Sequence, residues 1–166
     1  MAKVVIRGFF GAKQSFNVAS AAVGGSPYNS NQVPTATWAA GNLFVLSAAA
    51  GLTDAYVEKN SVSGSAIMGV AMENSSEALT AVAGMSQPSG SKVTLLHGHS
   101  EFEIEGDQYE VYEPEVESAS LMDVLYASPN GKFASFAADG SGQAIGFITK
   151  VPSSANSYTL GVVLFG

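Results

Sequence analysis

The side chains best suited to chemistry lie in one short stretch, residues 95–105, which contains both histidines of the chain. On a single extended strand His97, His99 and Glu103 would project from the same face, because alternate residues of a strand point to the same side. Two imidazoles and a carboxylate so placed can hold a divalent metal ion, which makes these three residues candidate ligands. The same alternation turns Phe102 and Ile104 inward and the acids outward, and this pattern favours an exposed polar strand face over a metal site.

The spacing His-x-His-x3-Glu resembles the first metal motif of cupins. Two departures separate the chain from that family: Ser91 and Glu110 stand where the flanking glycines would be, and no third histidine is present. The chain also lacks a Gly-x-Ser-x-Gly nucleophile elbow, a Gly-Lys-Ser/Thr phosphate loop and any cysteine. We therefore expect a protein that is not an enzyme, has no cofactor and uses no thiol or iron–sulfur chemistry.

Charge is sparse and unevenly distributed. Charged residues make up 13% of the chain and the formal net charge is −7. Eight of the 14 acidic residues lie in residues 101–117, where alternating acids are typical of a solvated strand that resists unwanted pairing. Residues 1–53 contain Lys3, Arg7 and Lys13 and no acid, so this part could complement the acidic body of a neighbouring copy. A net acidic body repels phosphate backbones, and we expect no nucleic-acid partner.

The 166 residues suffice for one domain with its own core. Turn residues recur at short intervals between apolar runs, which predicts an all-β body, a small β-barrel or β-sandwich, over residues 42–166. Within it, Asn130 and Gly131 predict a tight hairpin between two strands. The chain has no apolar run of membrane-spanning length and no secretory signal at its start, so we expect synthesis in the cytoplasm and no membrane partner.

Residues 1–41 are predicted to form an extended, irregular arm. Residues 14–53 carry no charge and are rich in Gly, Ser and Asn, which disfavours long regular elements. The arm nevertheless contains five aromatic residues that are costly to leave in water: Phe9, Phe10, Phe16, Tyr28 and Trp38. These five are candidate contacts with another subunit or a shell, and an irregular cap on the chain's own core is the alternative. If the arm is separate, removing residues 1–40 should abolish assembly and leave the body folded.

The hydrophobic and turn patterns of residues 67–73, 122–133, 142–152 and 158–165 resemble those of tailed-bacteriophage head decoration (cement) proteins. The resemblance implies a virion structural protein on the capsid exterior, assembled in the host cytoplasm. It also implies a homotrimer whose partners are its own copies and the major capsid protein. Two alternatives stay open, another phage assembly module (tail tube, fibre or adhesion) and a carbohydrate-binding β-domain.

Overall fold

The computed structural model describes residues 3–9, 11–18, 38–47, 56–75, 81–82, 85–86, 92–105, 109–110, 119–135, 142–156 and 158–166. These residues form strands and one short 3-10 helix, η1 (Ser154–Asn156), which confirms the all-β prediction. The strands are β1 (Lys3–Phe9), β2 (Ala12–Val18), β3 (Leu43–Leu46), β4 (Tyr56–Lys59), β5 (Gly69–Ala71), β6 (Ala81–Val82), β7 (Met85–Ser86), β8 (Lys92–His97), β9 (Ser100–Glu105), β10 (Tyr109–Glu110), β11 (Val124–Ala127), β12 (Phe133–Ala134), β13 (Gly146–Lys150) and β14 (Leu160–Leu164).

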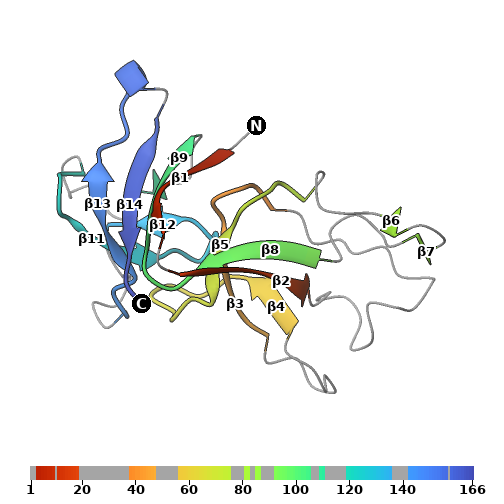
Figure 1. Ribbon diagram of the computed structural model, residues 1–166. Helices are drawn as coiled ribbons and strands as arrows, with labels where there is room; N and C mark the ends of the chain where they lie inside the picture. The colour runs from red at the N-terminus through yellow and green to blue at the C-terminus, as the bar shows by residue number, and fades with distance from the viewer. Residues whose placement is uncertain are drawn as a thin grey trace.

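Five strands close into a small barrel in the order β2-β4-β3-β5-β8 (Figure 1). The barrel closes where β2 and β4 pair in parallel, at Asn17 and Tyr56. Its interior is filled by side chains from every wall strand and from the segment before β3: Phe16, Val18, Trp38, Phe44, Val57, Ala71, Val93 and Leu95. Closure leaves these five strands with few unpaired edges, which is the usual way a small β-protein avoids edge-to-edge association.

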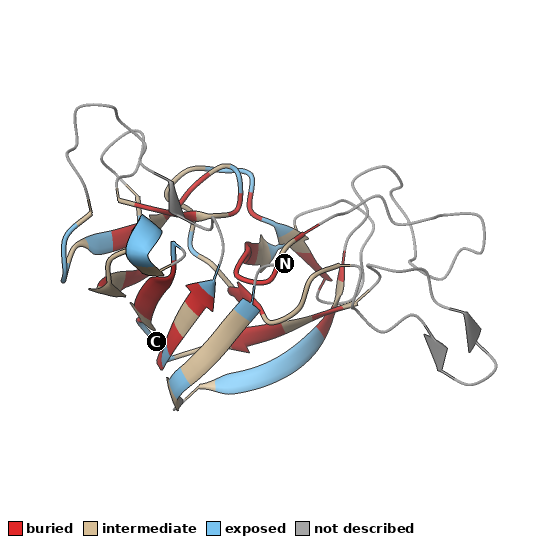
Figure 2. Ribbon diagram, turned by 90° about the horizontal axis from the view of Figure 1, so that it is seen from above, coloured by how far each residue is buried: buried red, intermediate tan, exposed pale blue. Residues whose placement is uncertain are grey.

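Seven strands form an open sheet in the order β1-β9-β14-β13-β11-β12-β10. A second core joins this sheet to the outside of the barrel: Leu43, Val70 and Leu96 from barrel strands pack with Phe102, Ile104, Leu125, Ile148 and Val162 from the sheet. Buried residues therefore run through both layers in Figure 2. The other face of the sheet carries Glu101 and Glu105, which are exposed, as the alternation of β9 predicts.

The two layers are connected by one bent pair of strands. β1 pairs with β9 in the sheet, and β2, the next strand along the chain, pairs with β8 in the barrel. The bend requires glycine on both strands: Gly98 has φ +79°, and a Cβ on Gly11 would collide with the carbonyl oxygen of His97. The strand pairs β1–β9 and β2–β8 thus lead from the sheet into the barrel.

The irregular character of the predicted N-terminal arm (1–41) is not confirmed. Residues 3–9 and 11–18 are regular strands, because β9 and β8 supply hydrogen-bonding partners for their backbones. Residues 19–37, which include Tyr28, lie outside the described residues, as does Phe10. The division of the chain into an arm and a body at residue 41 stays a prediction.

Candidate functional site

The candidate metal ligands do not share one strand face, because β8 ends at His97 and β9 begins at Ser100. A shared face would require one strand through residues 97–103, whereas Gly98, with φ +79°, turns the chain between β8 and β9. The ring of His97 lies edge-on to Phe16 with centroids 6.2 Å apart, and its Nε2 is buried without a hydrogen-bond partner. Among the described residues, no three His, Asp or Glu side chains gather closely enough to hold a metal ion.

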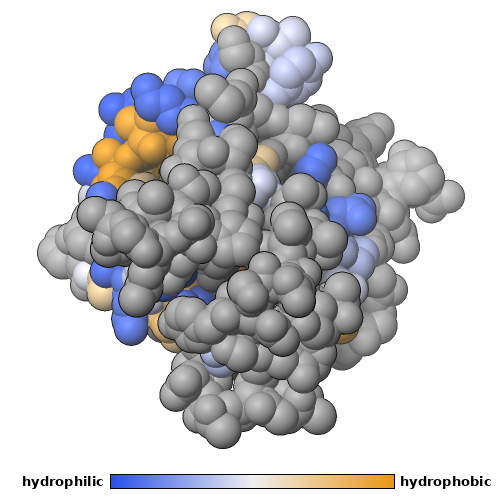
Figure 3. All heavy atoms as spheres, turned by 90° about the vertical axis from the view of Figure 1, so that its right-hand side faces the viewer, coloured by the Kyte–Doolittle hydropathy of each residue, from blue (hydrophilic) through white to orange (hydrophobic). Residues whose placement is uncertain are grey.

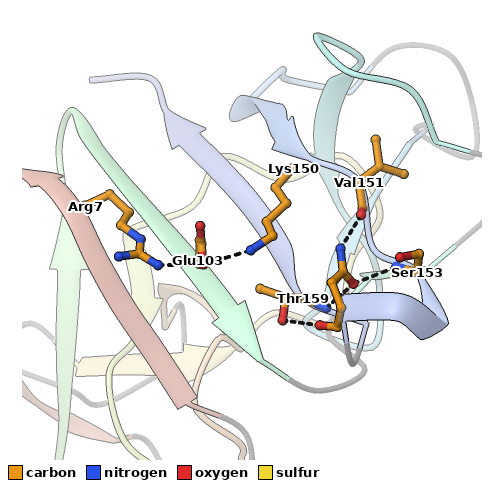
Figure 4. Close-up of polar contacts among 7 residues, drawn as sticks. Arg7, Glu103, Lys150, Val151, Ser153 and Thr159 are labelled. Carbon is orange, nitrogen blue, oxygen red and sulfur yellow. Dashed lines mark hydrogen bonds and ion pairs between the residues drawn. The ribbon is translucent and has the colours of Figure 1, made fainter.

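Glu103, the third candidate, belongs to a ladder of charges across the sheet (Figure 4). Its Oε2 accepts a hydrogen bond from Arg7 Nη2 at 3.0 Å and one from Lys150 Nζ at 3.3 Å. Arg7 and Lys150 approach from opposite sides, and the hydrogen bond from Arg7 holds the pKa of Glu103 below its usual value, against the opposing effect of burial. This carboxylate therefore pairs with two cationic side chains of its own chain.

Lys150 can reach Glu103 because a glycine occupies the strand between them. Gly161 on β14 is the register partner of both Glu103 and Lys150. A Cβ at this position would lie 2.6 Å from Lys150 Cβ and 2.8 Å from Lys150 N. Gly161 therefore permits both the close approach of β13 and the bridge over β14.

The two aromatic interface candidates whose side chains are described are buried in their own chain. Phe16 is 7% exposed and Trp38 is 5% exposed, both inside the barrel. Trp38 lies edge-on to Phe44 at 5.5 Å, and its Nε1 donates a hydrogen bond to the carbonyl oxygen of Glu73 at 2.9 Å. Trp38 in this position cannot stack on a sugar ring. For Phe9 the structure describes only the backbone, on β1, which pairs with Ser100.

Other large apolar residues are exposed, and four of them, Leu121, Met122, Val124 and Phe165, lie on strands of the seven-stranded sheet or close to their ends. We call Leu121, Met122, Val124, Phe147 and Phe165 the sheet patch. Val124 is the register partner of Phe147, whose ring lies 5.9 Å from that of Phe165. Leu121 is 62% exposed and Met122 is 66% exposed, in the turn that enters β11. Sequence reasoning missed this patch, although the turn places two large apolar residues together just before β11.

The turn of the sheet patch has a defined shape. Met122 adopts φ 70°, which is uncommon for a residue other than glycine. The conformation is held because Ser120 N donates to Asp123 Oδ2 at 2.7 Å and Met122 N donates to the Ile148 carbonyl oxygen at 2.8 Å. The side chains of Leu121 and Met122 are therefore presented on a fixed backbone. On the face drawn in Figure 3, a cluster of hydrophobic atoms is bordered by hydrophilic ones.

No family model, no curated protein and no solved structure matches the chain. Within the described residues, no helix has the length and apolar character needed to cross a bilayer.

Proposed function

We propose that the protein is a virion structural protein that decorates a bacteriophage capsid, binds the outer surface of the shell and bridges its subunits. The observation that carries the proposal is the sheet patch, in which Val124, Phe147 and Phe165 lie side by side and Leu121 and Met122 are exposed in the turn that enters β11. Large apolar side chains that stay exposed in one cluster are typical of a surface that binds another protein. The resemblance of residues 122–133, 142–152 and 158–165 to decoration proteins covers the same strands.

In this proposal the protein works by binding alone, as a homotrimer, with the major capsid protein as its partner. Covering an apolar side chain of this size contributes about 1.5–3 kcal/mol before the costs of association. One copy would therefore bind weakly. Several copies of the patch on one trimer, repeated over a lattice, would raise the overall affinity through multivalency.

The test is cosedimentation of the purified chain with empty heads assembled from the major capsid protein of the same phage. Replacing both Leu121 and Met122 with serine should lower the affinity about tenfold or more, because two exposed apolar side chains are lost. The matched control is Tyr158→Asn, which removes a side chain that is 59% exposed and lies outside the patch. Asparagine tolerates the positive φ of this position, so the control should fold and bind normally.

Unchanged cosedimentation of the Leu121→Ser, Met122→Ser variant would contradict the assignment of the patch, and no cosedimentation of the parent chain would contradict the function itself. Native mass spectrometry of the purified chain tests the trimer separately. A mass of three chains supports it, and a monomer at micromolar concentration contradicts it.

A further inference from the structure

A pocket of about 400 Å³ lies between the β3–β4 hairpin and residues 60–68. Its lining includes Leu46, Glu58, Asn60, Val62, Ile67 and Met68. Its volume is within the usual range for small-molecule sites, about 300–1,000 Å³. It does not overlap the sheet patch.

The pocket is preformed, because its covering loop is held at both ends. Asn60 is buried, and its Nδ2 donates to the carbonyl oxygens of Val62 at 2.8 Å and Ser128 at 2.6 Å. At the other end, Met68 N donates to the carbonyl oxygen of Phe44 at 2.7 Å. A ligand would therefore meet walls that are already in place, which lowers the entropic cost of binding.

The walls combine apolar side chains with a single charge, the carboxylate of Glu58. Leu46 and Val62 are exposed beside it, so the pocket has an uncovered apolar surface. Glu58 Oε2 accepts a hydrogen bond from the Ser47 hydroxyl at 3.0 Å, and no basic residue is among those that line the pocket. Lys59, the next residue, lies against Gly131 instead.

We infer that this pocket binds an alkylammonium or alkylguanidinium group, that is, a cation carried on a short apolar chain. The cation would form a charge-assisted hydrogen bond with Glu58, and the alkyl chain would lie against Leu46, Val62 and Ile67. Lysine and arginine side chains have this chemistry, because their methylene stems pack on apolar surfaces while the charged end stays polar. A free alkylamine has it too. The inference goes beyond the proposed function and does not depend on a capsid.

The experiment is an NMR titration of the ¹⁵N-labelled full-length chain with n-butylguanidinium at constant ionic strength. Saturable shifts should be confined to residues 43–47 and 56–68. Glu58→Gln should weaken binding about tenfold or more, because the amide can still accept a hydrogen bond but no longer carries the negative charge that strengthens it. Glu101→Gln, which neutralises an exposed carboxylate on β9, should leave the dissociation constant unchanged. Methylguanidinium should bind about fourfold more weakly for each methylene it lacks.

A second titration, with a peptide, distinguishes the two sources of the cation. If a short peptide with one arginine between apolar residues binds more tightly than n-butylguanidinium, the ligand is a side chain of a protein; equal or weaker binding indicates a small amine. Shifts that do not saturate would overturn the inference, as would equal binding by Glu58→Gln or by the uncharged n-butylurea. The spectrum of each variant shows directly whether it is folded. The result is independent of cosedimentation with heads, so the two proposals can fail separately.

Discussion

Deleting residues 1–40 should unfold the whole protein rather than release a folded body. The deletion removes β1 and β2, and β2 is a wall of the barrel that pairs with β8 over six consecutive positions, Ala12–Asn17. Without it the barrel opens, and β4 and β8 both lose a neighbour. The opposite result is expected if residues 1–41 form a separate arm.

The magnitude follows from the side chains that the deletion removes. Phe16, Val18 and Trp38 are all buried in the barrel core. Truncating a buried Phe or Trp to alanine costs about 3–5 kcal/mol, whereas a whole domain is stable by only about 5–15 kcal/mol. Loss of two such residues together with two strands therefore removes most or all of the stability.

Circular dichroism and urea titration of the truncated chain provide the assay. Because truncation removes many groups at once, Phe16→Ala should be measured beside it, with an expected loss of about 3–5 kcal/mol. Trp38 is the chain's only tryptophan and stays in this variant as a fluorescence reporter inside the barrel. Gln14→Ala is the matched control on the same strand, and because Gln14 is exposed its effect should stay within about 0.5 kcal/mol.

A truncated chain that unfolds cooperatively near the urea midpoint of the full chain would refute this reasoning. So would a Phe16→Ala variant no less stable than Gln14→Ala. Either result would mean that β2 contributes little to the barrel and that residues 1–41 behave as a separate arm.

Two further predictions concern the charged ladder. Gly161→Ala should destabilise the protein by about 1–3 kcal/mol in urea, because its Cβ would collide with the Lys150 backbone. Gly8→Ala, whose Cβ would make only 3.5 Å contacts with the Glu101 side chain, should have little effect, and equal losses for both would contradict the argument. The hydrogen bond from Arg7 lowers the pKa of Glu103 in the folded state. The folding stability that this hydrogen bond adds is fully present above the unfolded-state pKa of about 4.3, and it is lost as the pH falls through the folded-state pKa. Glu103→Gln should thus be less stable than the parent by up to about 1 kcal/mol at pH 7, with a smaller difference near pH 3. A difference that is constant between these pH values would show that the ion pair is not its source.

Much of the local structure could be read from short sequence patterns. Apolar runs bounded by turn residues predicted an all-β chain, and the described residues form strands and one short 3-10 helix. Asn130 and Gly131 predicted a hairpin, and β11 and β12 pair in antiparallel fashion around this turn, where Gly131 has φ +71°. These features depend on a few neighbouring residues, and for that reason they were predictable.

The candidate site was less predictable, because its parts depend on distant residues. A metal site on one face would have required His97, His99 and Glu103 on a single strand, but the chain bends at Gly98, where the barrel meets the sheet. That bend separates His97 from Glu103, and Glu103 instead joins Arg7 and Lys150. No local pattern indicates such a bridge.

The sequence alone determined that this is an all-β chain, that a hairpin turn lies at Asn130 and Gly131, and that its aromatic residues must be covered. Only the tertiary structure decided what covers them: the barrel of the same chain buries Phe16 and Trp38, while the large apolar residues left exposed include Leu121 and Met122. Whether a side chain is buried depends on which other parts of the chain pack against it. For Phe16 that surface includes its register partner Val93, far along the chain, and the local sequence cannot specify such a contact.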